Sequence, residues 1–393
     1  VLAASLLVLL GSLALAMAAA ARWHRGSGVA SVDRGPRPLA TTGHGLLGTA
    51  GLALVAVVAA APVVADAANK EARLAWLPLV AEARSAAEAG EALSFLDRAG
   101  IRLRLARRLA PWDAAYALGL ARLQTERAGL MDDLMTRRLA AAGSAAVPSP
   151  DQGEYDPFLL AGEALELAQG RDEAMGEALA EAAAAEELSA PGPEAPLTRA
   201  RALRVWGGLT REEERRRHRL AAADGAYAEA IDRAPNWPEV YDEAAWVAIL
   251  AGDPAGALGR TEEALAADPF FLRAHRTAAR AHAALGDAVA AAAQYDLYFA
   301  DERNAADVDA QRGRLEVLAA AGRRADALVV AEGIVRLAPD DPRGYADLAV
   351  LRQARGDLAG ARAAAAVAAS LAPSDPGIAA LVKDLAKELA PGP

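Results

Sequence analysis

Two stretches near the N-terminus are apolar without interruption, whereas the rest of the chain alternates apolar and polar residues at helical spacing. Residues 1–21 and residues 46–65 contain no charged side chain. At ~1.5 Å per helical residue, each stretch would cross roughly the 30 Å hydrocarbon layer of a bilayer. Gly48, Gly51 and Pro62 lie in the second stretch, but membrane helices tolerate both residue types. We therefore expect two transmembrane helices, one over 1–21 and one over 46–65, in contact with lipid.

The segment 22–45 between these stretches is polar and rich in Gly and Pro. It carries four arginines, whereas Lys70, Arg73 and Arg84 follow the second stretch. Because positive charge favours the cytoplasmic side, the four arginines predict a basic cytoplasmic loop over 22–45. The protein is then expected in the bacterial inner (cytoplasmic) membrane with its remaining residues outside the cytoplasm.

A signal peptide is the competing interpretation of the second apolar stretch. Arg34 and Arg37 would be its basic start, and Ala65-Asp66-Ala67 would supply a small-residue cleavage site. The two-span interpretation is favoured because a signal peptide begins a protein, whereas this one would follow another apolar stretch of membrane-spanning length.

A turn motif recurs in the C-terminal half with a period near 34 residues. Its four members are spaced by 34, 36 and 34 residues: Gly252-Asp253, Gly286-Asp287, Gly322-Arg323 and Gly356-Asp357. An alanine follows each glycine by five positions, and prolines recur where the second helix of each unit would end: Pro235, Pro269, Pro339 and Pro373. Glycine permits a tight turn between two helices, and proline stops a helix. The slot near Arg303 lacks its proline, which predicts one irregular boundary.

These markers resemble those of the tetratricopeptide repeat (TPR) family over about 223–390. The resemblance implies an α-solenoid of stacked helix pairs whose first helices line a concave face that binds a protein or peptide partner. The expected fold is therefore all-α. Residues 66–222 are predicted to form degenerate TPR-like helical repeats with linkers at 143–156 and 189–197, and 223–393 to form TPR repeats with a C-terminal capping helix.

One first helix carries a stripe of arginines that is the main candidate site. Arg273, Arg276 and Arg280 lie at i, i+3 and i+7, so they share one face. The neighbouring first helices offer six further side chains: Glu239, Asp242, Trp246, Asp309, Arg312 and Glu316. Either the arginines form salt bridges between repeats, or they bind an anionic ligand such as a carboxylate or phosphate. Trp246 is either a partner anchor or part of the core. The candidate partner-binding residues are thus Arg273, Arg276, Arg280 and Trp246.

The sequence nominates no catalytic residue, cofactor or metal. His275 and His282 are two helical turns apart, ~10 Å, which is too far for one ion without a third ligand between them. The chain has no cysteine, and it lacks a Walker glycine loop, a nucleophile elbow and a His-Glu-x-x-His helix. We expect no catalysis by these residues alone.

The charge distribution argues against nucleic acid as a partner. The formal charge is -10, and residues 1–64 carry four arginines against one aspartate, or +3, so the remaining residues carry -13. An acidic body of this kind repels phosphate backbones. The run REEERRRHR at 211–219 pairs Glu212 with Arg216 and Glu213 with Arg217 at i, i+4, which predicts a solvated helix face.

The order of elements also resembles the C-terminal part of O-antigen ligase or polymerase-type membrane proteins. The resemblance comes from the two spans with a basic loop, from Ala110-Pro111-Trp112-Asp113, and from the segments RALRVWGG (201–208) and AYAEAIDRAPNWPEVYDEAAW (226–246). That family transfers sugars from a lipid-linked donor, but its reactive loop is missing from these residues. Two hypotheses follow. In one, the chain is the membrane-anchored TPR interaction region of such a protein of cell-surface polysaccharide assembly. In the other, it is a complete two-span scaffold that recruits partner proteins at the bacterial membrane.

Overall fold

The described part of the chain is all helical. The computed structural model describes residues 86–141, 162–188, 192–373 and 375–388, and in these ranges it contains helices and no strand, as expected. The stretches 1–21 and 46–65, the loop 22–45 and the linker 143–156 lie outside the described residues. Among the helices that are described, none is long and apolar enough to cross a bilayer.

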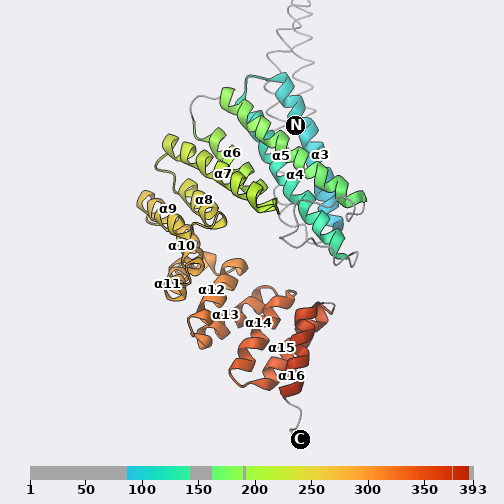
Figure 1. Cartoon of the computed structure of the whole chain (residues 1–393), viewed down its shortest axis with the longest axis vertical. Coiled ribbons are helices and arrows are strands. Elements are labelled where there is room, and N and C mark those ends of the chain that lie inside the picture. The colour runs from blue at the N-terminus through green and yellow to red at the C-terminus, as the bar shows by residue number, and fades with distance from the viewer. Residues whose placement is uncertain (1–85, 142–161, 189–191, 374, 389–393) are drawn as a thin grey trace, which may run out of the picture. The chain divides into compact units, whose positions relative to one another are not determined.

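The chain divides into two compact units, with the division between Arg233 and Ala234. Figure 1 draws unit 1 in blue to yellow-green and unit 2 in yellow to red. The boundary expected between 222 and 223 falls inside a helix, α7 (Glu213–Arg233). That helix ends only before Ala234-Pro235, because the residue before a proline avoids the helical conformation.

Unit 1 contains five described helices: α3 (Ala86–Leu109), α4 (Ala114–Ala141), α5 (Gly162–Leu188), α6 (Glu194–Leu209) and α7. The stop expected at Ala110-Pro111 separates α3 from α4, and the Asp113 carboxylate accepts a hydrogen bond from the Ala115 N–H at 2.9 Å. The linker expected over 189–197 is shorter than predicted, since α6 already begins at Glu194. Pro196 fits this first turn because its missing N–H would have no helical partner there.

The long helices of unit 1 depart from the TPR pattern. Helices α4 and α5 have 28 and 27 residues and pack on each other, whereas α9 and α11 in unit 2 have 14 and 11 residues. Helices α6 and α7 also form a pair with a short connection, and Gly207 allows their close approach. A Cβ on Gly207 would lie 2.8 Å from the Leu220 side chain.

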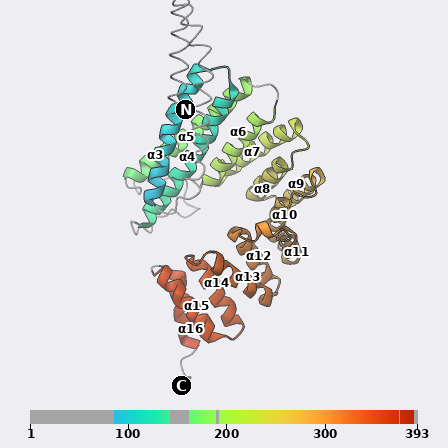
Figure 2. The same ribbon diagram turned by 180° about the vertical axis from the view of Figure 1, so that it is seen from behind.

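Unit 2 is a stack of helix pairs. In its described residues the pairs are α8 (Pro238–Leu250) with α9 (Pro254–Ala267), α10 (Arg273–Ala284) with α11 (Ala288–Tyr298), α12 (Val308–Ala320) with α13 (Arg324–Leu337), and α14 (Pro342–Ala354) with α15 (Leu358–Leu371). The first helix of each later pair also packs on the second helix of the pair before it. The final helix, α16 (Pro376–Glu388), lies beside α15 in both views (Figure 2).

The recurring glycines make the predicted turns. Gly252, Gly286, Gly322 and Gly356 have φ of +84°, +79°, +74° and +84°, a region that other residues resist. Each turn closes in the same way: the N–H after the glycine donates to the carbonyl five residues earlier, as from Asp253 to Ala248 at 2.8 Å. Three of the four turns then use an aspartate to cap the next helix, as Asp253 does for the Gly256 N–H at 2.9 Å. The TPR-type period of unit 2 is therefore confirmed.

Small residues set the distance between the helices. The alanines five positions after the glycines, Ala257, Ala291, Ala327 and Ala361, are completely buried. The irregular boundary expected near Arg303 is also present, because a short 3₁₀ helix, Glu302–Asn304, replaces the usual helix end. The Asn304 amide donates to the Tyr298 carbonyl at 2.8 Å and fixes this insertion against α11.

The turn glycines provide a test of the fold. Gly252→Ala is expected to lower the free energy of unfolding by about 1–2 kcal/mol, because alanine resists the left-handed conformation. Gly259→Ala in the adjacent helix α9 is the matched control and should raise it by about 0.5–1 kcal/mol. A Cβ meets no atom within 4 Å at either site, so only backbone conformation differs. Urea unfolding followed by circular dichroism measures both, and equal effects of the two changes would contradict the turn assignment.

Candidate functional site

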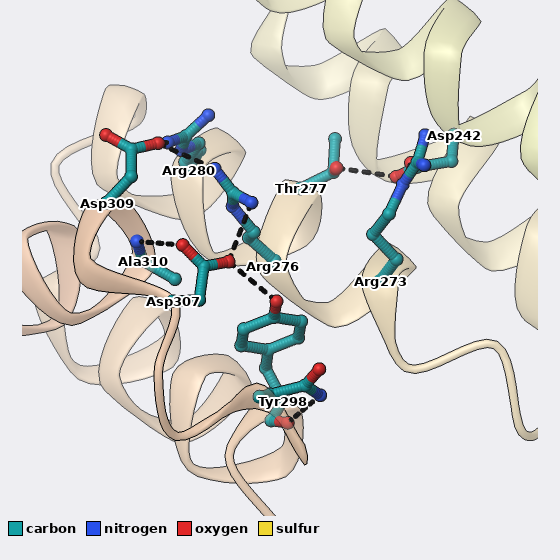
Figure 3. Close-up of polar contacts among 10 residues, drawn as sticks. Asp242, Arg273, Arg276, Thr277, Arg280, Tyr298, Asp307, Asp309 and Ala310 are labelled. Carbon is teal, nitrogen blue, oxygen red and sulfur yellow. Dashed lines mark hydrogen bonds and ion pairs between the residues drawn. The ribbon is translucent and has the colours of Figure 1, made fainter. Parts of the chain in front are cut away.

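The predicted arginine stripe lies along α10, between α8 and α12 (Figure 3). Each guanidinium points at a carboxylate from a neighbouring repeat. Arg273 reaches back to Asp242 on α8, whereas Arg276 and Arg280 reach forward to aspartates at the start of α12. The stripe is therefore neutralised by inter-repeat ion pairs.

Asp242 is the most buried acid of this network. Its side chain is 4 % exposed, and it accepts hydrogen bonds from Arg273 Nε at 2.7 Å and from the Thr277 hydroxyl at 2.5 Å. A carboxylate removed from water in this way is costly unless its oxygens are satisfied. Both donors come from α10, so they bind the second helix pair to the first.

The forward contacts centre on Asp307 and Asp309. Arg276 donates to Asp307 at 2.8 Å and to Asp309 at 2.6 Å, and Arg280 also donates to Asp309 at 2.6 Å. Asp307 caps α12 through the Ala310 N–H at 3.0 Å. Although burial opposes it, the guanidiniums of Arg280 and Arg276 hold the pKa of Asp309 below its ordinary value.

Tyr298 completes this junction from α11. Its hydroxyl donates to Asp307 at 2.7 Å (Figure 3). Burial, together with the negative charge of Asp307, raises the pKa of the Tyr298 hydroxyl to about 12. The phenol therefore stays protonated, and the hydrogen bond to Asp307 persists over the physiological range.

Arg280 occupies a special position in the stripe. Its guanidinium lies over the Trp246 ring, 4.7 Å from the ring centroid, which is the geometry of a cation–π contact. It also adjoins Tyr295, whose pKa is raised by burial against the opposing effect of Arg280. Trp246 is half-buried, so it serves both as a support for Arg280 and as part of the surface of α8.

A cleft of about 200 Å³ opens beside Arg280, between α10 and α12. Polar groups line most of it, and Ala283, Gly313 and Val317 supply its apolar part: the polar residues are Arg280, Tyr295, Asp309, Arg312 and Glu316. Gly313 is needed for the Tyr295 ring, because a Cβ there would lie 2.1 Å from the Tyr295 hydroxyl oxygen. The cleft is thus a polar hollow floored by a buried tyrosine.

The contacts of the arginine stripe bear on the two interpretations of its charge, salt bridges between repeats or an anionic ligand. Asp242 and Asp309 were identified as neighbours, and both pair with the stripe. Arg312 instead forms an ion pair with Asp341, which caps the next first helix, α14. The salt-bridge interpretation therefore describes the charges of the stripe, whereas a role in partner binding stays a prediction.

Sequence reasoning missed Asp307, Asp341, Tyr298 and Gly313. A signal for the two aspartates was present, because Asp307-Val308 and Asp341-Pro342 begin first helices at matching positions, as capping residues do. No sequence signal connects Tyr298 or Gly313 to the site, since their contacts depend on the irregular boundary and on the facing ring.

The other candidate features have structural roles. His275 Nδ1 lies 2.7 Å from the Gln294 amide oxygen on α11, within its own helix pair. In the run at 211–219, Arg217 pairs with Glu213 at 2.8 Å as predicted, whereas Glu212 pairs with Arg215 at 2.9 Å. Arg219 at its end instead lies over the Trp206 ring, 3.9 Å from the centroid.

Known proteins resemble this chain in structure only. No protein-family model and no curated protein sequence matches it. YrrB, described as a TPR protein with an unusual peptide-binding site, is 17% identical over 53% of this chain and 98% of its own, with a TM-score of 0.42. A TPR protein from Parabacteroides merdae is 15% identical over 75% of this chain and 93% of its own, with a TM-score of 0.43. The protein pilF of Pseudomonas aeruginosa is 13% identical over 57% of this chain and 94% of its own, with a TM-score of 0.44. At these values no function carries over, and the TPR-type assignment depends on the turns and packing described above.

Proposed function

We propose that unit 2 is a protein-binding module that captures its partner on the face formed by the first helices of its pairs. The observation that carries this proposal is the cleft beside Arg280, which lies between two consecutive first helices, α10 and α12. A helical stack offers a continuous surface of this kind without a water-excluding pocket. Such an open surface is better suited to binding a polypeptide than to catalysing a reaction.

The charge around the cleft favours a basic group on the partner. Arg276 and Arg280 are matched by Asp307 and Asp309, and Arg312 by Asp341. Two more carboxylates, Glu316 on α12 and Asp347 on α14, add to this balanced set. Burial raises the pKa of the Asp347 carboxyl, against the attraction of Arg312. A lysine or arginine side chain of the partner fits this environment better than the anion considered from the sequence.

The membrane part of the proposal comes from the sequence. The stretches 1–21 and 46–65 are long enough to span a bilayer and carry no charge, and they would hold the repeats at the bacterial inner membrane on its extracytoplasmic side. The resemblance to O-antigen ligase or polymerase-type proteins makes cell-surface polysaccharide assembly the proposed setting, with a free-standing two-span scaffold as the alternative. The reading frame upstream of Val1 separates them, since further apolar spans are expected only in the first case.

Peptide capture is tested on a defined array. The full chain is applied to immobilised peptides of varied charge, and the affinity of each bound peptide is then measured in solution for variants. Glu316→Arg reverses the charge in the cleft and is expected to weaken binding at least about tenfold, or ~1.4 kcal/mol. Glu262→Arg makes the same change on the exposed surface of α9, outside the cleft, and should leave the affinity unchanged.

Preference for basic peptides, together with this difference between the variants, supports the site. If both variants bind every peptide as the parent does, or if acidic peptides are preferred, the cleft is not the capture site. Helix content and the unfolding midpoint are measured for each variant, so that a folding defect is not taken for a binding defect.

Membrane topology is tested with reporter fusions at Gly35 and after Pro393. The loop is expected in the cytoplasm and the C-terminus outside it, because four arginines favour cytoplasmic placement of 22–45. The two fusions should therefore report opposite compartments. Cytoplasmic signal from both would overturn the second span, and a reversed pair of signals would overturn the orientation.

A further inference from the structure

The outward face of α3 carries large apolar side chains that no described helix covers. Ile101 is 63 % exposed and Leu105, one turn later, is 52 % exposed. Trp112, in the turn after α3, is 56 % exposed. Because Ile101 and Leu105 lie at i, i+4, they form one short apolar strip.

The strip lies on the side of α3 that does not pack against the other described helices. The opposite side of the helix buries Leu96, Ala99 and Leu103 in the core shared with α4. Its flank is fixed to α5 by ion pairs, from Arg104 to Glu177 at 3.3 Å and from Arg107 to Glu181 at 3.5 Å. Ile101 and Leu105 therefore face away from the described helices of their unit.

Positive charge accompanies the strip. Arg98, Arg102 and Arg108 are exposed, and their spacing places them on the same side of α3 as Ile101 and Leu105. The residues beyond 64 carry a charge of -13, so a cationic patch with exposed aliphatic and indole groups is unusual for this body. Arginine and aliphatic side chains on one exposed helix face, with a tryptophan in the turn that follows, are a composition that binds the headgroup layer of a membrane.

We propose that the outward face of α3 rests on the surface of an anionic lipid bilayer. The guanidiniums would bind lipid phosphates. The boundary between headgroups and acyl chains would take up the apolar stems of the arginines together with Ile101, Leu105 and Trp112. The sequence position agrees, because only residues 66–85 separate α3 from the apolar stretch 46–65. Lipid is favoured over an acidic protein because the apolar strip is narrow, and a lipid surface does not have to match its shape.

The test uses the absence of native cysteine from the chain. Ile101→Cys places one environment-sensitive fluorophore on the strip of the full-length protein. Val329→Cys on α13 is the matched control, since Val329 is an exposed aliphatic residue, 65 % exposed, on unit 2. Each labelled protein is combined with vesicles of phosphatidylcholine, alone or mixed with phosphatidylglycerol. The label reports on α3 locally, so the result is independent of partner capture by unit 2. Because 1–21 and 46–65 carry no charge, comparison of the two lipid compositions separates binding by α3 from insertion of these stretches.

We expect the label at 101 to brighten several-fold and shift to the blue with phosphatidylglycerol, and to lose much of this response at high salt, where charge is screened. The label at 329 should not respond. The triple variant Arg98→Gln, Arg102→Gln, Arg108→Gln, shown to be folded by circular dichroism, should lose most of the response at 101. The proposal is overturned if the fluorescence of the label at 101 stays that of a water-exposed label with both kinds of vesicle. An apolar signal that is independent of lipid charge and salt also overturns it, because residues 66–85 or a second protein then cover the strip.

Discussion

The helix pairs of unit 2 depend on their neighbours, because in all of the described pairs except α12 with α13 most of the buried apolar side chains are alanine. Ala257, Ala291, Ala327 and Ala361 let the helices of a pair approach closely, but a methyl group buries little apolar area, and stability grows with the area removed from water. A pair of this kind cannot stand alone. The stack must therefore gain its stability from contacts between successive pairs, as in other solenoids.

The ion pairs along α10 supply such contacts, and they decide which surface remains for a partner. Asp242, Asp307 and Asp309 each join one repeat to the next while they neutralise the arginines. The network leaves the polar cleft above Tyr295, which Glu316 also lines. The stripe that is basic in the sequence is thus, in the folded chain, a row of ion pairs between repeats beside a polar cleft.

The sequence predicted the parts of the fold that depend on local chemistry. The turn glycines have positive φ because few other residues can adopt it, so their period alone located the pairs of unit 2. The expected boundary at 222 falls inside α7, which runs without an internal stop to Arg233, just before Ala234-Pro235. The linker at 189–197 was overextended, since proline in a first helical turn looks the same in sequence as proline in a loop. Repeat spacing placed Asp242 and Asp309 beside the arginines, whereas the contacts of Tyr298 and Gly313 depend on the irregular boundary and on the facing ring, which spacing does not encode. The predicted membrane spans lie outside the described residues and stay predictions.

A double-mutant cycle between Arg273 and Asp242 tests the account most directly. Arg273→Met, Asp242→Ala and the double variant are compared by urea unfolding, with the exposed pair Arg217 and Glu213 on α7 as a reference cycle. If the ion pairs join the repeats, the coupling energy of Arg273 with Asp242 should be about 1–3 kcal/mol, against about 0.3–0.5 kcal/mol for the exposed pair. A coupling energy near zero between Arg273 and Asp242 would contradict the claim that the stripe is a seam between repeats, and would leave its arginines to a ligand.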